Sequence, residues 1–373
     1  MSPAPPPRAM KRTPRRSSPK AVPKVPGTSP EAPGTARRRT SGIPVRKPAR
    51  RRTPVEQVLA KVFEDGGVTL VIGAGASLPH GVPGWKSLVR RLWEEATPES
   101  PLPEDSPLEA LPTVALERIA ARLGPEAFIE RLRAHLYAGC TRPKREALLS
   151  GDDTLSVIAR ALVQEQARGP ARRIQRVISF NADDLLERAC ARLSPRKPIL
   201  RAVTRASHHP ERGLGQQPIP CYHLHGYLPA PGSAPWHLAS PDALVFTEAQ
   251  YWRSVATPLS FANRVMAFAL HDTRCLFIGL SMTDLNVLRW LAARADEIEI
   301  DKRNQFSPRD PSPSRVDGAV RRALERHFWI HAPQDDPGGH LADHLETRGV
   351  RSVVLENGWQ SDDLSRLFRQ LLP

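Results

Sequence analysis

The polar residues with the clearest capacity for chemistry follow a short β-branched segment at positions 177–180. Asn181 and Asp183 come directly after it, in the sequence Ser-Phe-Asn-Ala-Asp. Polar side chains at the carboxyl ends of strands lie where open α/β sheets bind ligands. The Asn181 amide can both donate to and accept from a ribose hydroxyl or a water. The alternative is local: Asp183 could cap a following helix, and Asn181 could serve a turn.

Two histidines stand at the end of a later β-branched segment, Cys221-Tyr-His-Leu-His-Gly. Strand alternation predicts that His223 and His225 share one face. A zinc site built on both would need two further ligands, and no nearby cysteine or acidic cluster supplies them, so we expect no metal. His225 is the candidate general base, because its ordinary pKa lies near neutrality and Gly226 lets a ligand approach closely. A purely structural histidine is the alternative.

A glycine-rich turn follows the first β-branched segment, Val68–Ile72. It runs from Gly73 to Ser77 as Gly-Ala-Gly-Ala-Ser, and Gly-Val-Pro-Gly-Trp follows at positions 81–85. A strand that ends in small residues before a helix exposes backbone N–H groups and a positive helix end, which can hold a pyrophosphate. The GxGxxG fingerprint is nevertheless broken, because Leu78 occupies its third glycine position. The turn is therefore either nucleotide-binding or structural.

A fourth segment, Phe277-Ile-Gly-Leu-Ser-Met-Thr-Asp, turns from a predicted strand into a predicted helix. Gly279 and Ser281 offer a second edge of small residues, suited to a ribose or an adenine. An ordinary turn with Thr283 or Asp284 as helix cap fits the same residues.

Each of the four segments ends a predicted strand, and between them β-branched runs alternate with amphipathic stretches. Such alternation is typical of a parallel α/β sheet, so we predict a Rossmann-like parallel sheet flanked by helices. Strands are predicted at Val68–Ile72, Val177–Phe180, Cys221–Leu224, Cys275–Ile278, Phe328–His331 and Ser352–Leu355. Helices are predicted at Val55–Glu64, Trp85–Ala96, Leu108–Arg122, Glu126–Tyr137, Thr154–Ala167, Ala182–Leu193, Pro258–Leu270, Asp284–Ala295 and Asp362–Leu372.

About a hundred residues separate the first two predicted strands, which is too long for a simple crossover. They contain several helical patterns and no strand pattern, so we predict an inserted helical layer at about residues 97–170, packed over the carboxyl edge of the sheet. Residues 301–317, rich in proline, serine and charge, are predicted to form a surface loop. One domain would then occupy residues 55–373.

The basic character of the chain belongs to its first 54 residues. They contain 15 Lys or Arg and one acid, Glu31, whereas the remainder has 39 basic and 38 acidic residues. With thirteen prolines and few large apolar residues, this segment cannot bury enough surface to fold, so we expect a disordered tail or an extension from a misplaced start site. The alternative is a salt-sensitive contact with nucleic acid.

Four cysteines, at positions 140, 190, 221 and 275, make no CxxC pair, so neither a zinc ribbon nor a disulfide framework is indicated. The chain has no apolar run long enough to span a membrane, and no apolar stretch follows the first basic residues. We therefore expect a cytoplasmic protein without a membrane partner.

Together and in this order, the four motifs resemble the sirtuin (silent information regulator two) superfamily, specifically the bacterial sirtuin-like domains associated with anti-phage defence. Members show a GAGxS loop with a following GIP or GVP, an N-x-D segment, an HG dipeptide and a late G-x-S segment. The resemblance implies NAD as the ligand. Asn181 and Asp183 would organise the nicotinamide ribose and an attacking water, and His225 would act as base. The NAD-contacting residues would be Gly73, Ala74, Gly75, Ser77, Pro83, Gly226, Gly279, Ser281 and Asp284.

The chain departs from protein-deacetylating sirtuins in two respects. It lacks the two CxxC pairs of their zinc module, and Ser179-Phe180 stands where Thr-Gln commonly precedes the N-x-D segment. The missing module frames part of an acyl-lysine groove, so the resemblance favours water as acceptor. We therefore expect an NAD hydrolase that releases nicotinamide and ADP-ribose, without zinc, and serves anti-phage defence by depleting NAD.

Two other functions stay open. The domain could be a sensor that binds NAD or ADP-ribose without turnover, or it could be an NAD-dependent deacylase or ADP-ribosyltransferase. The resemblance further implies an activating protein or phage component, and assembly into a homo-oligomer, as possible partners.

Overall fold

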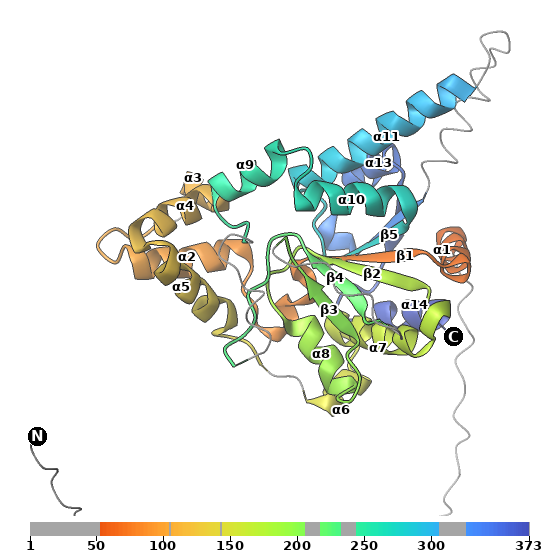
Figure 1. The fold of residues 1–373 in the computed structure, drawn as a ribbon, viewed down its shortest axis with the longest axis horizontal. Helices are drawn as coiled ribbons and strands as arrows, with labels where there is room; N and C mark the ends of the chain where they lie inside the picture. Colours follow the sequence, from red (N-terminus) through yellow and green to blue (C-terminus); the bar gives the residue numbers. More distant parts are fainter. Residues whose placement is uncertain are drawn as a thin grey trace, which may run out of the picture. The chain divides into compact units, whose positions relative to one another are not determined.

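The computed structural model describes residues 53–103, 106–141, 144–205, 217–232, 244–305 and 326–372. These residues form a seven-stranded sheet in the order β3-β4-β2-β1-β5-β6-β7, with every neighbouring pair parallel (Figure 1). Helices flank the sheet, so the predicted Rossmann-like α/β fold is confirmed. The strands are β1 (Val68–Ile72), β2 (Ile174–Ser179), β3 (Leu200–Val203), β4 (Ile219–His223), β5 (Arg274–Ile278), β6 (His327–His331) and β7 (Val350–Val354).

The central strand β1 is buried along its whole length, as expected for a parallel strand covered on both faces. Because side chains alternate along a strand, Leu70 and Ile72 enter one hydrophobic core and Val71 enters another. The helices that contribute buried residues to the first core are α1 (Pro54–Asp65), α2 (Trp85–Ala96), α4 (Pro112–Leu123), α5 (Pro125–Tyr137), α6 (Arg145–Ser150), α7 (Thr154–Ala167), α8 (Leu185–Leu193) and α14 (Asp363–Leu371). Those of the second are α10 (Phe261–Asp272), α11 (Leu285–Gln305) and α13 (His340–Glu346).

The predicted helical layer between the first two strands is confirmed. Among the described residues, helices α2 to α7 separate β1 from β2 without an intervening strand. Asp153 caps α7 by accepting the Ser156 N–H (2.9 Å), and its carboxylate lies 2.8 Å from His80 Nε2. Burial opposes ionisation of Asp153, but the bonds from His80 and Ser156 outweigh it and lower its pKa to about 2. This charged cap joins the turn after β1 to the inserted layer.

Several elements differ from their predicted bounds. The edge strand β3 escaped prediction because it has four half-buried residues and no alternation. Helix α8 begins at Leu185 rather than Ala182, and residues 301–305 belong to α11 rather than to a loop. The predicted helix Leu108–Arg122 is two helices, separated at Leu111 before Pro112. Short helices absent from the prediction are α6 (Arg145–Ser150) and α9 (Glu248–Ala256), together with α13, and the short first piece of the divided helix is α3 (Pro107–Ala110).

Two predicted segments fall outside the described residues: positions 1–52 of the basic tail and positions 306–317 of the charged loop. In the part of the chain that is described, no helix combines the length and apolarity needed to cross a membrane. The four cysteines are free thiols.

Gly81 packs against the backbone of the inserted layer. Its φ is +88°, and a Cβ at this position would collide with the Gly139 carbonyl. Gly339 has a similar left-handed backbone, φ 71°, with open space around its Cβ position. We expect Gly339→Ala to cost about 1 kcal/mol from backbone conformation. Gly81→Ala adds the collision and should cost several times more. Urea denaturation of both variants measures the difference, and equal costs would contradict the contact.

Candidate functional site

The glycine turn after β1 packs backbone to backbone against the turn after β5. Gly73 donates its N–H to the Ile278 carbonyl (3.0 Å), and Gly75 donates to the Gly279 carbonyl (2.9 Å). A Cβ at Gly73 would lie 2.5 Å from the Gly279 oxygen, and one at Gly75 would lie 2.9 Å from the Gly279 Cα. Two of the glycines singled out from the sequence are therefore required for this close approach, whatever ligand binds above them.

The same turn has few N–H groups left for a phosphate in this conformation. Besides Gly73 and Gly75, Ala76 donates to the Gly73 carbonyl (3.1 Å) and Ser77 to the Ala74 carbonyl (2.9 Å). The segment forms a short 3₁₀ turn, Ala74–Ala76, rather than the start of a long helix. The expectation of freely exposed N–H groups is therefore wrong for these four residues, because the neighbouring backbone already accepts them.

Asn181 joins the turns that follow β1 and β2. Its side-chain amide donates to the Gly73 carbonyl (3.1 Å) and lies 3.1 Å from Ser77 Oγ. Its backbone is also fixed, because the Asn181 N–H donates to Ser179 Oγ and the Asn181 carbonyl accepts from that hydroxyl, each at 3.1 Å. The residue is half-buried, and the structure thus brings Asn181, Gly73 and Ser77 together at the carboxyl edge of the sheet.

Asp183 is buried, with 5% of its surface exposed. It accepts the N–H of Leu185, the first residue of α8, at 3.0 Å. The capping role that the sequence left open is therefore present. Burial raises the pKa of Asp183 to about 6, against the opposing effect of hydrogen bonds from Leu185 and Ser77. The carboxyl group is thus poised to exchange a proton near neutral pH.

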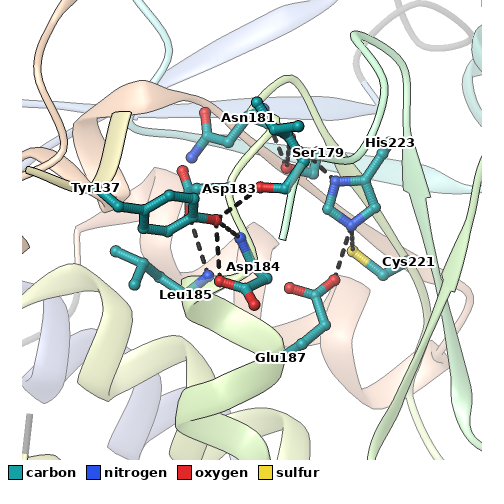
Figure 2. Close-up of polar contacts among 10 residues, drawn as sticks. Tyr137, Ser179, Asn181, Asp183, Asp184, Leu185, Glu187, Cys221 and His223 are labelled. Carbon is teal, nitrogen blue, oxygen red and sulfur yellow. Dashed lines mark hydrogen bonds and ion pairs between the residues drawn. The ribbon is translucent and has the colours of Figure 1, made fainter. Parts of the chain in front are cut away.

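Both ring nitrogens of His223 have polar partners at this edge, although the sequence analysis considered this residue only as a metal ligand (Figure 2). Its Nδ1 lies 3.0 Å from the Asn181 carbonyl oxygen, and its Nε2 lies 2.7 Å from Glu187 Oε1. Burial opposes protonation, but the Glu187 carboxylate outweighs it and raises the pKa of His223. The sequence signal for this ion pair is the acidic residue Glu187 on α8, the helix that precedes β3 and β4 in the chain.

The ligand atoms of Glu187, Cys221 and His223 all lie within 4.8 Å of one another. They are donor types that zinc accepts. Cys221 Sγ lies 3.5 Å from His223 Nε2, the same nitrogen that contacts Glu187. The expectation that no nearby cysteine or acidic residue could supply further ligands beside the histidines is therefore wrong for His223. The 2.7 Å distance between His223 Nε2 and Glu187 Oε1 is also that of a charge-assisted hydrogen bond.

His225 lies apart from His223, so the prediction that both share one face is wrong. Strand β4 ends at His223, and the alternation ends with it, because Gly226 turns the chain at φ 87°. The His225 ring packs edge-on against Phe180, with centroids 5.2 Å apart. Burial lowers the pKa of His225, although the charge of Asp284 partly opposes this effect. The imidazole is therefore neutral at neutral pH and can accept a proton.

A small cavity lies beneath the Asn181 turn and has room for roughly one water molecule. His225 and the glycines of the turn after β1 are not among its lining residues. This cavity is too small for a nicotinamide ribose. The turns that follow the adjacent strands β4, β2, β1 and β5 form the rim of the sheet's carboxyl edge. The polar residues that line the cavity are Ser77, Ser179, Asn181, Asp183, Glu187 and His223.

The segment after β5 forms the other side of the rim. Asp284 accepts the Asn286 N–H (2.8 Å) and so caps α11, as the alternative interpretation of this residue predicted. Ser281 is exposed, and its hydroxyl lies 2.8 Å from that of Thr283. Met282 is fully buried at φ 56°, the one left-handed residue other than glycine among those described. The tight turn holds Ser281 outward, where a ligand could reach it.

Tyr137, at the end of α5, fixes the inserted layer to this edge. Its hydroxyl lies 2.8 Å from the Leu228 carbonyl and 2.9 Å from Asp184 Oδ1, and it accepts the Asp184 N–H at 2.9 Å (Figure 2). These contacts hold the start of α8 directly after Asp183. No sequence motif indicated a role for this tyrosine, because its partners, Asp184 and Leu228, lie far from it in the chain.

Comparisons with known proteins gave one family-model match and a structural match. Residues 175–338 match the family model described as a SIR2-like domain, which supports the sirtuin-like superfamily assignment predicted from the motifs. A solved structure described as "Structural Basis for the Mechanism and Regulation of Sir2 Enzymes" is similar over 86% of this chain and 98% of that chain, with 13% identity and a TM-score of 0.39. A search of curated proteins gave no match. The matched range includes Asn181, His225 and Gly279 but not the glycine turn at 73–77.

The raised pKa of Asp183 predicts a specific dependence of stability on pH. A folded pKa of about 6 lies above the ordinary value of 3.8, so this group favours folding at low pH and loses that contribution as the pH rises from about 4 through about 6. We expect Asp183→Asn, which keeps an oxygen for the Leu185 N–H, to be more stable than the parent at pH 8 by about 3 kcal/mol, and nearly equal to it near pH 4.

Urea denaturation across this pH range makes the measurement, with Asp343→Asn on the exposed face of α13 as the control. A gain for Asp183→Asn that is the same at pH 4 and pH 8 would contradict a buried carboxyl of raised pKa.

Proposed function

We propose, from the sirtuin-like assignment that the SIR2-like match over residues 175–338 supports, that this protein is an NAD glycohydrolase. It would cleave the nicotinamide–ribose bond and transfer the ADP-ribosyl group to water, with NAD as substrate. The observation that carries the proposal is the fixed side chain of Asn181, which the Gly73 carbonyl and Ser77 Oγ hold at the carboxyl edge of the sheet. Ligands of open α/β sheets bind at this edge.

The chemistry makes modest demands on the protein. Nicotinamide leaves NAD as a neutral molecule from a cationic ring, so the site must mainly orient the ribose and aim a water at its anomeric carbon. Asn181 would hold the ribose hydroxyls or the water, and Asp183 would support it with a carboxyl whose pKa lies at about 6. Developing positive charge on the ribose favours such a nearby carboxylate.

His225 is the proposed general base. Its ring contacts Phe180, the residue before Asn181, and its lowered pKa keeps the imidazole neutral and able to accept a proton from water. The Phe180 contact is the observation that puts His225 near Asn181, since His225 does not line the cavity below Asn181. We therefore place the nicotinamide ribose above the rim, between Asn181 and His225.

The remaining NAD contacts would come from the two packed turns and their surroundings. The turn after β1 would approach the phosphates through Ala74, and the exposed hydroxyl of Ser281 would face the adenosine half. These assignments follow the motif resemblance, and the same applies to the other NAD-contacting residues, which are Gly73, Gly75, Ser77, Pro83, Gly226, Gly279 and Asp284.

We further propose that the protein acts in the cytoplasm, in anti-phage defence, by depleting NAD once a protein or phage component activates it. The activating partner in this proposal follows from the motif resemblance. Assembly into a homo-oligomer and a nucleic-acid contact through residues 1–54 belong to the same proposal, as does a domain occupying residues 55–373.

Release of nicotinamide by the purified full chain tests the proposal. We expect Asn181→Ala and His225→Ala each to lower the rate of NAD loss by about a hundredfold or more, because each removes a group that acts on the ribose or the water. Matched controls are Asn304→Ala and His271→Ala, whose side chains are exposed on α11 and α10. Unchanged melting temperatures separate lost chemistry from lost folding.

Parental rates in both site variants would overturn the assignment. If the domain is instead a sensor that binds NAD without cleaving it, calorimetry detects NAD binding while no nicotinamide appears. Nicotinamide release that requires an added acyl-lysine peptide or acceptor protein would instead identify a deacylase or an ADP-ribosyltransferase.

A further inference from the structure

We propose that His223 and Glu187 form a buried ion pair whose role is to position Asn181. The inference rests on the proposed function, in which the Asn181 side chain contacts the ribose or the attacking water. His223 touches neither in this arrangement, so it is a positioning residue.

The contacts place His223 between helix α8 and the Asn181 peptide. Its Nδ1 is 3.0 Å from the Asn181 carbonyl oxygen, and its Nε2 is 2.7 Å from Glu187 Oε1. The ring has 2% of its surface exposed, and the Tyr227 ring packs against it with centroids 4.6 Å apart. Packing and two hydrogen bonds therefore leave the imidazole a single orientation.

Hydrogen-bond chemistry determines the protonation of this ring. A backbone carbonyl can only accept, so Nδ1 carries a proton, and an ionised carboxylate can only accept, so Nε2 carries one as well. His223 is then an imidazolium. The charged and titratable groups around it are Glu187, Asp183, Cys221 and Tyr227. Of these, the carboxylates of Glu187 and Asp183 favour the cation despite its burial.

A cation at His223 strengthens its bond to the Asn181 carbonyl, because hydrogen bonds with an ionised donor are shorter and stronger than neutral ones. The carbonyl and the side chain of Asn181 belong to the same residue, directly after β2. Fixing the carbonyl therefore limits rotation of the backbone that carries the amide. The contacts with the Gly73 carbonyl and Ser77 Oγ then fix the orientation of the side-chain amide.

The same three residues that could serve as metal ligands are thereby assigned another role. Zinc would take the lone pair of His223 Nε2, which the ion pair uses for a proton. The two arrangements exclude each other at that atom, so the state of Nε2 is a direct test.

Nuclear magnetic resonance of the full chain with ¹⁵N-labelled histidine reports that state without any activity. We expect His223, assigned by its absence in a His223→Asn variant, to show protons on both ring nitrogens at neutral pH. In Glu187→Gln we expect one proton only, on Nδ1. An unprotonated Nε2 in the parent, or stoichiometric zinc in the purified protein, would overturn the ion pair.

Two double variants test the positioning role without leaving a buried charge unpaired. E187Q/H223N keeps an N–H that can reach the Asn181 carbonyl, whereas E187Q/H223L has none. We expect kcat for NAD cleavage to be about tenfold lower in E187Q/H223L than in E187Q/H223N, at unchanged KM, because the amide acts in the transition state. Equal kcat in two variants of equal melting temperature would overturn the role.

A parent protein that releases no nicotinamide would refute the proposed function but not the positioning role. The Asn181 side-chain amide resonance, assigned with the Asn181→Asp variant, would then test the positioning role. We expect that resonance to keep its parental position in E187Q/H223N and to shift in E187Q/H223L. The same position in both double variants would overturn the role.

Discussion

The candidate site depends on the two hydrogen-bond contacts of the Asn181 side chain, to the Gly73 carbonyl and to Ser77 Oγ. They join the turns that follow β1 and β2, which are separated in sequence by the whole inserted helical layer. Parallel strands bring their carboxyl ends to the same edge, but they do not by themselves align the turns beyond that edge. The asparagine amide provides that alignment, and the backbone contact between the turns after β1 and β5 provides it on the other side.

Charge is concentrated beneath this rim rather than on it. Asp183, Glu187 and His223 are grouped around one small cavity, where burial makes each charge costly unless it is paired. Glu187 pairs with His223 through Oε1, whereas burial raises the pKa of the neighbouring Asp183 carboxyl to about 6. The neutral His225 lies on a separate part of the rim. The edge therefore combines a buried cluster of charged residues with a neutral histidine that can accept a proton.

The inserted layer contributes to the site through few but specific contacts. Tyr137 fixes Asp184 and the start of α8, and Gly81 lets the turn after β1 pass the backbone at Gly139. A hydroxyl that contacts both a carboxylate and a carbonyl can hold two segments in register. The insertion is thus part of the architecture that orients Asn181 and Asp183, and its loss would affect the rim as well as the core.

The sequence by itself determined the α/β class, the six longer strands and the positions of Asn181, His225 and the glycine turns at strand ends, because β-branched runs and small residues report local backbone preference. It also showed that Asp183 and Asp284 could be helix caps, since a cap depends on neighbouring residues only. The tertiary structure decided which distant residues contact one another. The facing of Gly73 and Gly279, the separation of His223 from His225 where β4 ends, and the His223–Glu187 pair all depend on which distant segments the sheet order brings together, and no local pattern encodes that order.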